Sequence, residues 1–160
     1  MTHPHAALVE RFYQALQRRD GAAMAACYHP EVRFSDPVFT ELRGPRAGAM
    51  WRMLTSRAPD LAVDFAGVTA DAAAGAARWE ARYTFGATGR RVHNVITATF
   101  AFRDGSIVEH RDVFDFWRWS RQALGPAGWL LGWTPALRNK VRAQAARGLD
   151  AFLAKAAATP

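Results

Sequence analysis

The chain has 160 residues, of which 50% are hydrophobic and 22% are charged. At this length a domain buries roughly two-thirds of its unfolded surface, so the fold does not depend on disulfides or metal ions for its stability. The composition excludes a disordered chain. The single cysteine, Cys27, excludes an intramolecular disulfide, and its apolar helical surroundings predict a core position. No basic segment followed by an apolar run precedes Ala7, which predicts a cytoplasmic location.

The net charge of +7 is concentrated near the C-terminus. Residues 1–117 contain 14 Arg and Lys against 13 Asp and Glu, a net of +1, whereas residues 118–160 contain 7 against 1, a net of +6. A nucleic-acid-binding domain carries a basic face on its folded body. Because the first 117 residues are almost neutral, we expect no nucleic-acid partner.

Hydrophobic periodicity and the positions of proline predict helices followed by strands. The expected helices cover residues 5–19, 22–28 and 45–59, with a short strand over 31–37. Four longer strands follow, over residues 61–69, 76–85, 91–102 and 107–117. Thr88-Gly89 and Asp104-Gly105 are hairpin signals between them. The sequence therefore predicts an α+β fold in which a curved antiparallel sheet packs on about three N-terminal helices.

The last predicted strand carries polar residues on an aromatic face. By alternation, His110, Asp112, Phe114 and Phe116 point the same way. Burial disfavours the charged form of a carboxyl group and raises its pKa towards neutrality, where it both gives and takes protons. We therefore predict Asp112 as a general acid or base, with His110 orienting or assisting it. The alternative is an inward aspartate that is simply hydrogen-bonded to His110 or Asn94.

A second carboxyl candidate is Asp36. It precedes Pro37, so it is either a second acid/base group or a turn residue whose carboxylate caps the local backbone. The residues expected to contact a substrate are Asn94, Tyr83, Trp79, Phe114, Phe116 and Tyr13. His110 and Asp112 lack a third ligand, and no glycine-rich phosphate loop is present, so we expect neither a metal nor a cofactor.

The last 43 residues differ in pattern from the rest. A Gly- and Pro-broken apolar stretch over residues 124–137 precedes a helix expected over 136–157. That helix has one apolar stripe, formed by Leu137, Val141, Ala145, Leu149 and Phe152. We expect residues 118–160 to pack on or extend the domain formed by residues 1–117. Alternatively, Trp129, Trp133 and the basic helix contact a partner or an anionic membrane surface.

Three motifs resemble the ketosteroid-isomerase and SnoaL-like superfamily, also called NTF2-like, over residues 5–117. Residues 12–16 (FYQAL) and 28–34 (YHPEVRF) resemble its opening helices and first strand. Residues 34–38 (FSDPV), followed by Arg43-Gly44, are similar to the segment whose aspartate shuttles a proton in steroid isomerases. Residues 110–115 (HRDVFD) resemble the last strand of SnoaL-like polyketide cyclases and limonene-epoxide-hydrolase-like proteins. The resemblance implies a cone-shaped roll with acid/base aspartates at positions 36 and 112.

The chain departs from two of these relatives at polar positions. Steroid isomerases hold the enolate oxygen with a tyrosine and a protonated carboxylic acid, and these positions correspond here to Phe12 and Ala98. Epoxide hydrolases also use an arginine and an aspartate on a neighbouring strand, where this chain has Trp79 and Ala81. Steroid isomerisation in its known form is therefore disfavoured, and so is epoxide hydrolysis. The resemblance to the cyclases, which rely on one aspartate with a nearby histidine such as His110, favours a cyclase or isomerase of another kind.

The resemblance implies a small-molecule pocket protein. The reaction it favours is cofactor-independent proton transfer on an apolar carbonyl or polycyclic substrate, in a homodimer that forms through the sheet. The alternative is a ligand-binding or dimeric assembly protein of the same fold without catalysis.

Overall fold

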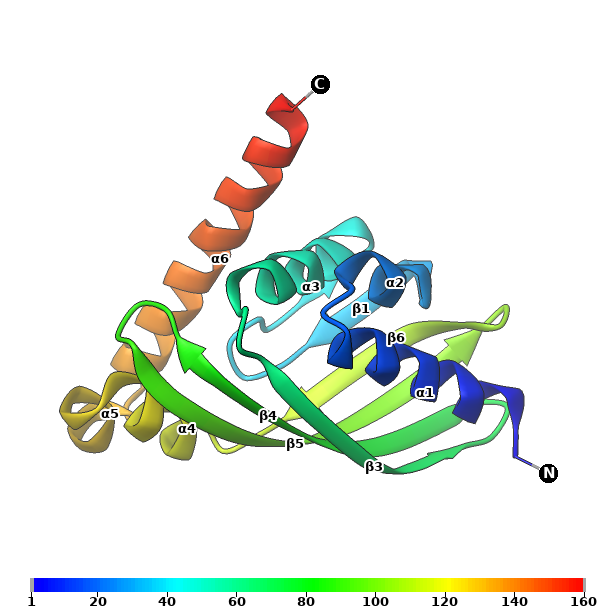
Figure 1. Cartoon of the computed structure of the whole chain (residues 1–160), viewed down its shortest axis with the longest axis horizontal. Helices are drawn as coiled ribbons and strands as arrows, with labels where there is room; N and C mark the ends of the chain where they lie inside the picture. The colour runs from blue at the N-terminus through cyan, green and yellow to red at the C-terminus, as the bar shows by residue number, and fades with distance from the viewer. Residues whose placement is uncertain (1, 160) are drawn as a thin grey trace.

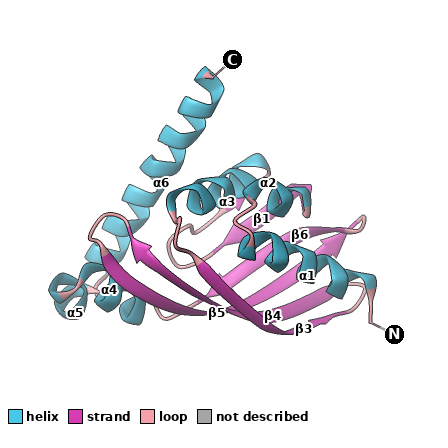
Figure 2. Ribbon diagram, in the orientation of Figure 1, coloured by secondary structure: helices cyan, strands magenta, loops and turns pink. Residues whose placement is uncertain are grey.

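The computed structural model describes residues 2–159 and shows a curved six-stranded sheet whose concave face is covered by helices (Figure 1). The elements are α1 (Pro4–Gln17), α2 (Gly21–Ala26), β1 (Tyr28–Ser35), β2 (Leu42–Arg43), α3 (Pro45–Arg57), β3 (Ala62–Ala70), β4 (Ala74–Phe85), β5 (Arg90–Arg103), β6 (Ser106–Val113), α4 (Phe116–Leu124), α5 (Pro126–Leu131) and α6 (Pro135–Ala158). Figure 2 shows α1, α2 and α3 on one side of the sheet. The predicted α+β class is confirmed.

The strand order is β2-β1-β6-β5-β4-β3. Strands β3 to β6 form the expected antiparallel meander, whereas β1 joins β6 in parallel. Asp104 and Gly105 connect β5 to β6 with φ angles of 53° and 74°. Two positive φ angles are characteristic of a type I′ turn, whose twist matches that of the flanking strands. This tight turn pairs Arg103 with Ser106, and a one-residue register shift between Ala101 and Phe102 then brings His110 opposite Phe100 and Asp112 opposite Ala98.

The last strand is shorter than its sequence pattern predicts. It ends at Val113, and Asp115 accepts a hydrogen bond from the Arg118 backbone N–H at 3.0 Å, capping α4. An N-cap carboxylate satisfies a helix N–H that has no partner within the helix, and this local contact prevails over strand alternation. The placement of Phe116 on the strand's inner face was therefore wrong. Phe116 instead begins α4 and is buried among Val92 and Trp119.

The C-terminal region forms three helices. Residues 124–137, which were expected to form a broken apolar stretch, include the last residue of α4, all of α5 and the start of α6. Helix α6 lies beside α3, and its end extends past the body of the domain (Figure 1). Leu149 is fully buried against the core, and Arg46 of α3 pairs with Asp150 at 3.0 Å.

Helices α2 and α3 approach each other closely at Gly21. A Cβ atom at position 21 would lie 2.6 Å from Arg52 Cα and 2.8 Å from Thr55 Oγ1. Backbone atoms cannot yield as a flexible side chain can, so glycine is required by the packing. This contact sets the position of α3, which carries Trp51 into the core.

We predict that Gly21→Ala lowers the free energy of unfolding by about 1–3 kcal/mol because the helices must separate. Chemical denaturation measures this change. Gly86→Ala is the matched control, because no atom lies within 4 Å of the position its Cβ would take. Equal stabilities of the two variants would show that α2 and α3 do not pack as described.

Candidate functional site

A chain of hydrogen bonds crosses the core from α3 to β6. Trp51 Nε1 donates to Tyr28 Oη at 2.7 Å, and Tyr28 Oη lies 2.8 Å from His110 Nδ1. His110 Nε2 lies 2.9 Å from Asp112 Oδ1. His110 and Asp112 are only 1% and 3% exposed. The sequence prediction that both side chains point inward is correct, and their side chains reach each other.

These hydrogen bonds have a direction, which is set by the group that donates in each of them. An indole N–H can only donate, so the Tyr28 oxygen accepts from Trp51, and its hydroxyl group donates to His110 Nδ1 or accepts from it according to the imidazole tautomer. We assign the tautomer in which Tyr28 donates to Nδ1 and the imidazole proton on Nε2 is donated to Asp112. Every proton in the chain has an acceptor, and Asp112 is the last acceptor.

The two oxygens of the Asp112 carboxyl group have different surroundings. Oδ1 accepts from His110 Nε2 and, more weakly, from Trp79 Nε1 at 3.4 Å. Within residues 2–159, Oδ2 has no hydrogen-bond partner. Two donors on one oxygen hold the group in place, and the other oxygen remains available to a ligand.

Tyr13 contributes an unused hydroxyl group to the same region. Its ring is fully buried and stacks on Phe65 with centroids 5.3 Å apart. Its Oη has no hydrogen-bond partner in the described part of the chain. Burial and then the nearby Asp112 raise the pKa of Tyr13 well above its usual value, so the phenol keeps its proton. A buried donor without an acceptor is costly, and a ligand oxygen would satisfy it.

Asp36 has the turn contacts that its sequence context predicts and, in addition, a raised pKa. Its Oδ1 accepts from the backbone N–H groups of Val38 and Phe39 at 2.7 and 2.6 Å, as a turn residue does. Burial nevertheless raises its pKa to about 7, with the Asp112 charge adding to the effect. The Phe39 and Val38 N–H groups and the Arg142 guanidinium oppose that rise. The effect of the Asp112 charge on the pKa of Asp36 indicates that the two carboxyl groups lie within electrostatic reach of each other.

Tyr83, Asn94 and Phe114 lie towards the more exposed end of the concave face. All three are half-buried. Tyr83 Oη accepts from Trp119 Nε1 at 2.8 Å, and burial followed by the Asp36 charge raises its pKa. Asn94 is four residues along β5 from Ala98, the partner of Asp112, which places it roughly 13 Å away along the strand. Asp112 therefore contacts His110 and not Asn94.

Tyr28 and Trp51 are the site residues that the sequence analysis missed. Tyr28 opens β1, and Trp51 lies on α3. They reach His110 because β1 pairs with β6, with Phe34 opposite His110. A parallel pairing between strands so far apart in sequence leaves no local signal.

Aromatic side chains fill the interior around this site. The rings of Phe100, Phe34 and Phe12 have centroids 4.5, 5.0 and 5.3 Å from that of His110. Two surface grooves have volumes of about 550 and 560 Å³, and Asp112 lines neither of them. Neither groove therefore contains the candidate site. Among residues 2–159, no three His, Cys, Asp or Glu side chains are grouped as metal ligands would be.

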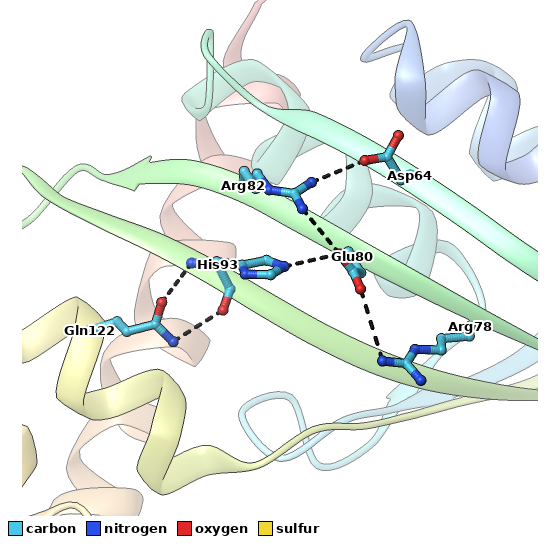
Figure 3. A network of polar contacts seen from close by, with 6 residues as sticks. All are labelled: Asp64, Arg78, Glu80, Arg82, His93 and Gln122. Atoms are coloured by element: carbon cyan, nitrogen blue, oxygen red, sulfur yellow. Dashed lines mark hydrogen bonds and ion pairs between the residues drawn. The ribbon is translucent and has the colours of Figure 1, made fainter.

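The outer face of the sheet carries a separate polar network (Figure 3). The Gln122 side chain of α4 accepts from the His93 backbone N–H at 2.7 Å and donates to the His93 carbonyl at 3.1 Å, as a neighbouring strand would. His93 Nε2 lies 3.0 Å from Glu80, which also pairs with Arg82, and Arg82 pairs with Asp64. Helix α4 thus protects the edge of β5 beyond the end of β6. The network lies on the opposite face from Asp112.

Comparisons with known proteins agree with this architecture. The sequence model of the SnoaL-like domain matches residues 9–110. A LEH-like epoxide hydrolase from M. tuberculosis has a TM-score of 0.65 and 25% identity, with 81% of this chain and 97% of that chain covered. TsrD from Streptomyces laurentii has a TM-score of 0.63 and 26% identity, with 74% and 93% covered.

A protein from Xanthomonas campestris, named as a candidate polyketide cyclase, has a TM-score of 0.63 and 20% identity, with 74% of this chain and 96% of that chain covered. At this identity the likeness shows the fold alone. No curated protein matches the sequence.

The raised pKa of Asp36 predicts a pH-dependent stability. Its folded-state pKa of about 7 exceeds the ordinary 3.8, so the folded chain binds more protons than the unfolded chain between these values. The free energy of unfolding should then fall as the pH rises through this window. Asp36→Asn cannot ionise but keeps the acceptor for Val38 and Phe39, so we expect it to match the wild type near pH 4 and to be more stable by roughly 2–4 kcal/mol near pH 8.

Denaturant unfolding at a series of pH values measures this difference. Asp36→Ala is the companion variant, because it removes the same ionisation but also removes the turn's acceptor. Its profile should run parallel to that of Asp36→Asn, at a lower stability. Parallel profiles for wild type and Asp36→Asn would contradict the raised pKa.

Proposed function

Because the chain belongs to the SnoaL-like domain family, we propose that it is a cofactor-independent enzyme of the isomerase or cyclase type. The family and the fold support a small-molecule-binding protein. The observation that carries the proposal of catalysis is the Asp112 carboxyl group, which is held through Oδ1 with Oδ2 available. The substrate class is an apolar compound with a carbonyl group, including polycyclic compounds.

The proposed first step is removal of a proton from the carbon next to the substrate carbonyl. Asp112 Oδ2 takes the proton, the C–H bond breaks, and the electron pair forms an enolate. His110 and Trp79 hold the carboxylate in place, which lowers the cost of orienting the base. The unused Tyr13 hydroxyl is the donor we assign to the enolate oxygen, because its proton is retained in the buried site.

The second step differs between isomerisation and cyclisation. In isomerisation, Asp112 returns the proton to a different carbon of the same substrate. In aldol cyclisation, the enolate carbon attacks a second carbonyl group, and the resulting alkoxide takes a proton. Asp36 is suited to supply that proton, since a pKa of about 7 leaves a substantial protonated fraction at neutral pH.

The proposed route for the substrate starts at the half-buried end of the concave face. Asp36, Tyr83 and Asn94 are partly exposed there, whereas Asp112 is 3% exposed. A substrate that enters from this end would pass Asp36 before it reaches Asp112. The polar groups of Tyr83 and Asn94 would bind its carbonyl or hydroxyl groups on the way.

Two other activities remain as outcomes of the experiment. The first is ligand binding without chemistry, in a protein that dimerises through the outer face of its sheet. The second is epoxide hydrolysis, the activity in the name of the M. tuberculosis relative. It is less favoured because Trp79 and Ala81 occupy the positions that resemble the hydrolases' arginine and second aspartate, and neither can protonate an epoxide.

We predict that Asp112→Asn slows proton exchange by about 10²- to 10⁴-fold. The assay incubates apolar cyclic ketones and 1,3-diketones with the protein in D₂O and follows deuterium uptake next to the carbonyl by mass spectrometry. Asn retains an acceptor for His110, so the fold should persist. Asp64→Asn is the matched control, because Asp64 pairs with Arg82 on the outer face.

Ligand affinity is measured in parallel by quenching of tryptophan fluorescence. Retained affinity with slowed exchange in Asp112→Asn supports the assigned role. Tight binding to the wild type without exchange above that of free ketone would establish a binding protein instead. Uptake of ¹⁸O from water into an epoxide, without deuterium uptake by ketones, would establish the hydrolase.

A further inference from the structure

Large apolar side chains are exposed together where α4 meets α5. Trp129, Leu130, Leu131 and Trp133 are 56%, 72%, 51% and 69% exposed, and Trp117 is 36% exposed. We call these five residues the α5 tip. Within the described part of the chain, the only other large apolar side chains exposed to this degree are Leu54 and Val113. Exposed apolar side chains that cluster usually mark an interaction surface.

The α5 tip is held firmly against α4. A Cβ atom at Gly128 would lie 1.9 Å from the Ser120 carbonyl oxygen, and one at Gly132 would lie 2.0 Å from Ser120 Oγ. Ser120 Oγ donates to the Trp117 carbonyl at 2.9 Å, and Trp117 Nε1 donates to the Trp129 carbonyl at 3.3 Å. The apolar side chains are therefore exposed by tight packing of the backbone beneath them and not by a frayed helix.

Arginines lie beside the α5 tip. A groove of about 550 Å³ runs beside it, lined by Arg90, Arg91, Arg118, Arg121, Gln122 and Trp129. The Arg121 guanidinium lies 4.2 and 4.6 Å from the ring centroids of Trp117 and Trp129, joining the basic and aromatic parts. No Asp or Glu occurs between Phe116 and Leu149. The nearest acidic groups have partners: Asp115 caps α4, and Asp60 accepts from Thr84 and lies 3.6 Å from Arg91.

We propose that the α5 tip docks on an anionic phospholipid bilayer. Trp129, Leu130, Leu131 and Trp133 enter the interface between head groups and acyl chains, where tryptophan is favoured. The arginine groove takes the phosphates of the head groups. None of the helices in residues 2–159 combines the length and apolarity that a bilayer crossing requires.

Charge favours a lipid surface over a second copy of this chain as the occupant. A two-fold contact between two α5 tips would bring the arginines of both copies together, without acidic groups from the tip to compensate. An anionic bilayer supplies the missing negative charge. Docking is independent of the chemistry at Asp112, because none of the tip residues touches that carboxyl group.

Co-sedimentation of the full chain with phosphatidylcholine vesicles, with and without phosphatidylglycerol, tests the proposal. We expect binding to the anionic vesicles that weakens with added salt, and little binding to the neutral ones. Leu130→Ser with Leu131→Ser should weaken binding by at least about tenfold. The matched control is Leu54→Ser with Val113→Ser, which removes exposed apolar side chains elsewhere and should bind as the wild type does.

The arginines are tested in the same way. Arg91→Gln with Arg118→Gln should weaken binding to anionic vesicles by about tenfold and reduce its dependence on salt. Arg52→Gln with Arg147→Gln removes equal charge from α3 and α6 and serves as the control. Circular dichroism verifies that every variant is folded.

Three results would overturn the proposal. One is the absence of binding to anionic vesicles at low salt. Another is equal loss of binding in the tip and control variants, which would indicate a non-specific effect of charge or apolarity. The third is a wild-type dimer that the leucine variant alone converts to monomer, without vesicle binding, which would make a second copy the occupant.

Discussion

The buried hydrogen-bond chain from Trp51 through Tyr28 and His110 to Asp112 is the constraint on which the rest of the structure depends. Four polar side chains inside an aromatic core are tolerated only if each has a partner. Trp51 is on α3, Tyr28 is on β1, and His110 and Asp112 are on β6. The hydrogen bonds among them therefore connect the helical layer to two strands. Loss of one member would leave a buried donor or acceptor without its partner.

The sequence was sufficient where structure is set locally. Alternation along the predicted strand over 107–117 placed His110 and Asp112 on one inward face, and Asp104-Gly105 predicted the hairpin turn before them, whereas the register shift between Ala101 and Phe102 was not predicted. Contacts between residues that are far apart in the sequence could not be predicted from these local patterns. Tyr28 meets His110 only through the parallel pairing of β1 with β6, and the burial that raises the pKa of Asp36 depends on how the chain packs around its turn. At Phe116 the strand pattern failed because Asp115 accepts a hydrogen bond from the Arg118 backbone N–H and so begins a helix.

The C-terminal helices lie beyond the segment that matches the family, yet they touch the candidate site. Trp119 of α4 donates to Tyr83, and Arg142 of α6 donates to the Pro37 carbonyl and lowers the pKa of Asp36 against the effect of burial. These helices therefore close the half-exposed end of the concave face and influence the charge of one proposed catalytic group. The same segment carries the α5 tip, so one part of the chain both completes the interior and presents an apolar surface.

The protonation of His110 tests the central claim most directly, and ¹⁵N NMR of the histidine-labelled chain measures it. At neutral pH the account predicts a protonated, pyrrole-type Nε2 that donates to Asp112 and an unprotonated, pyridine-type Nδ1 that accepts from Tyr28. In Tyr28→Phe, the Nδ1 resonance should shift because its donor is lost. A proton on Nδ1 would contradict the direction assigned to these hydrogen bonds, and an Nε2 without a proton would contradict the role of Asp112 as their final acceptor.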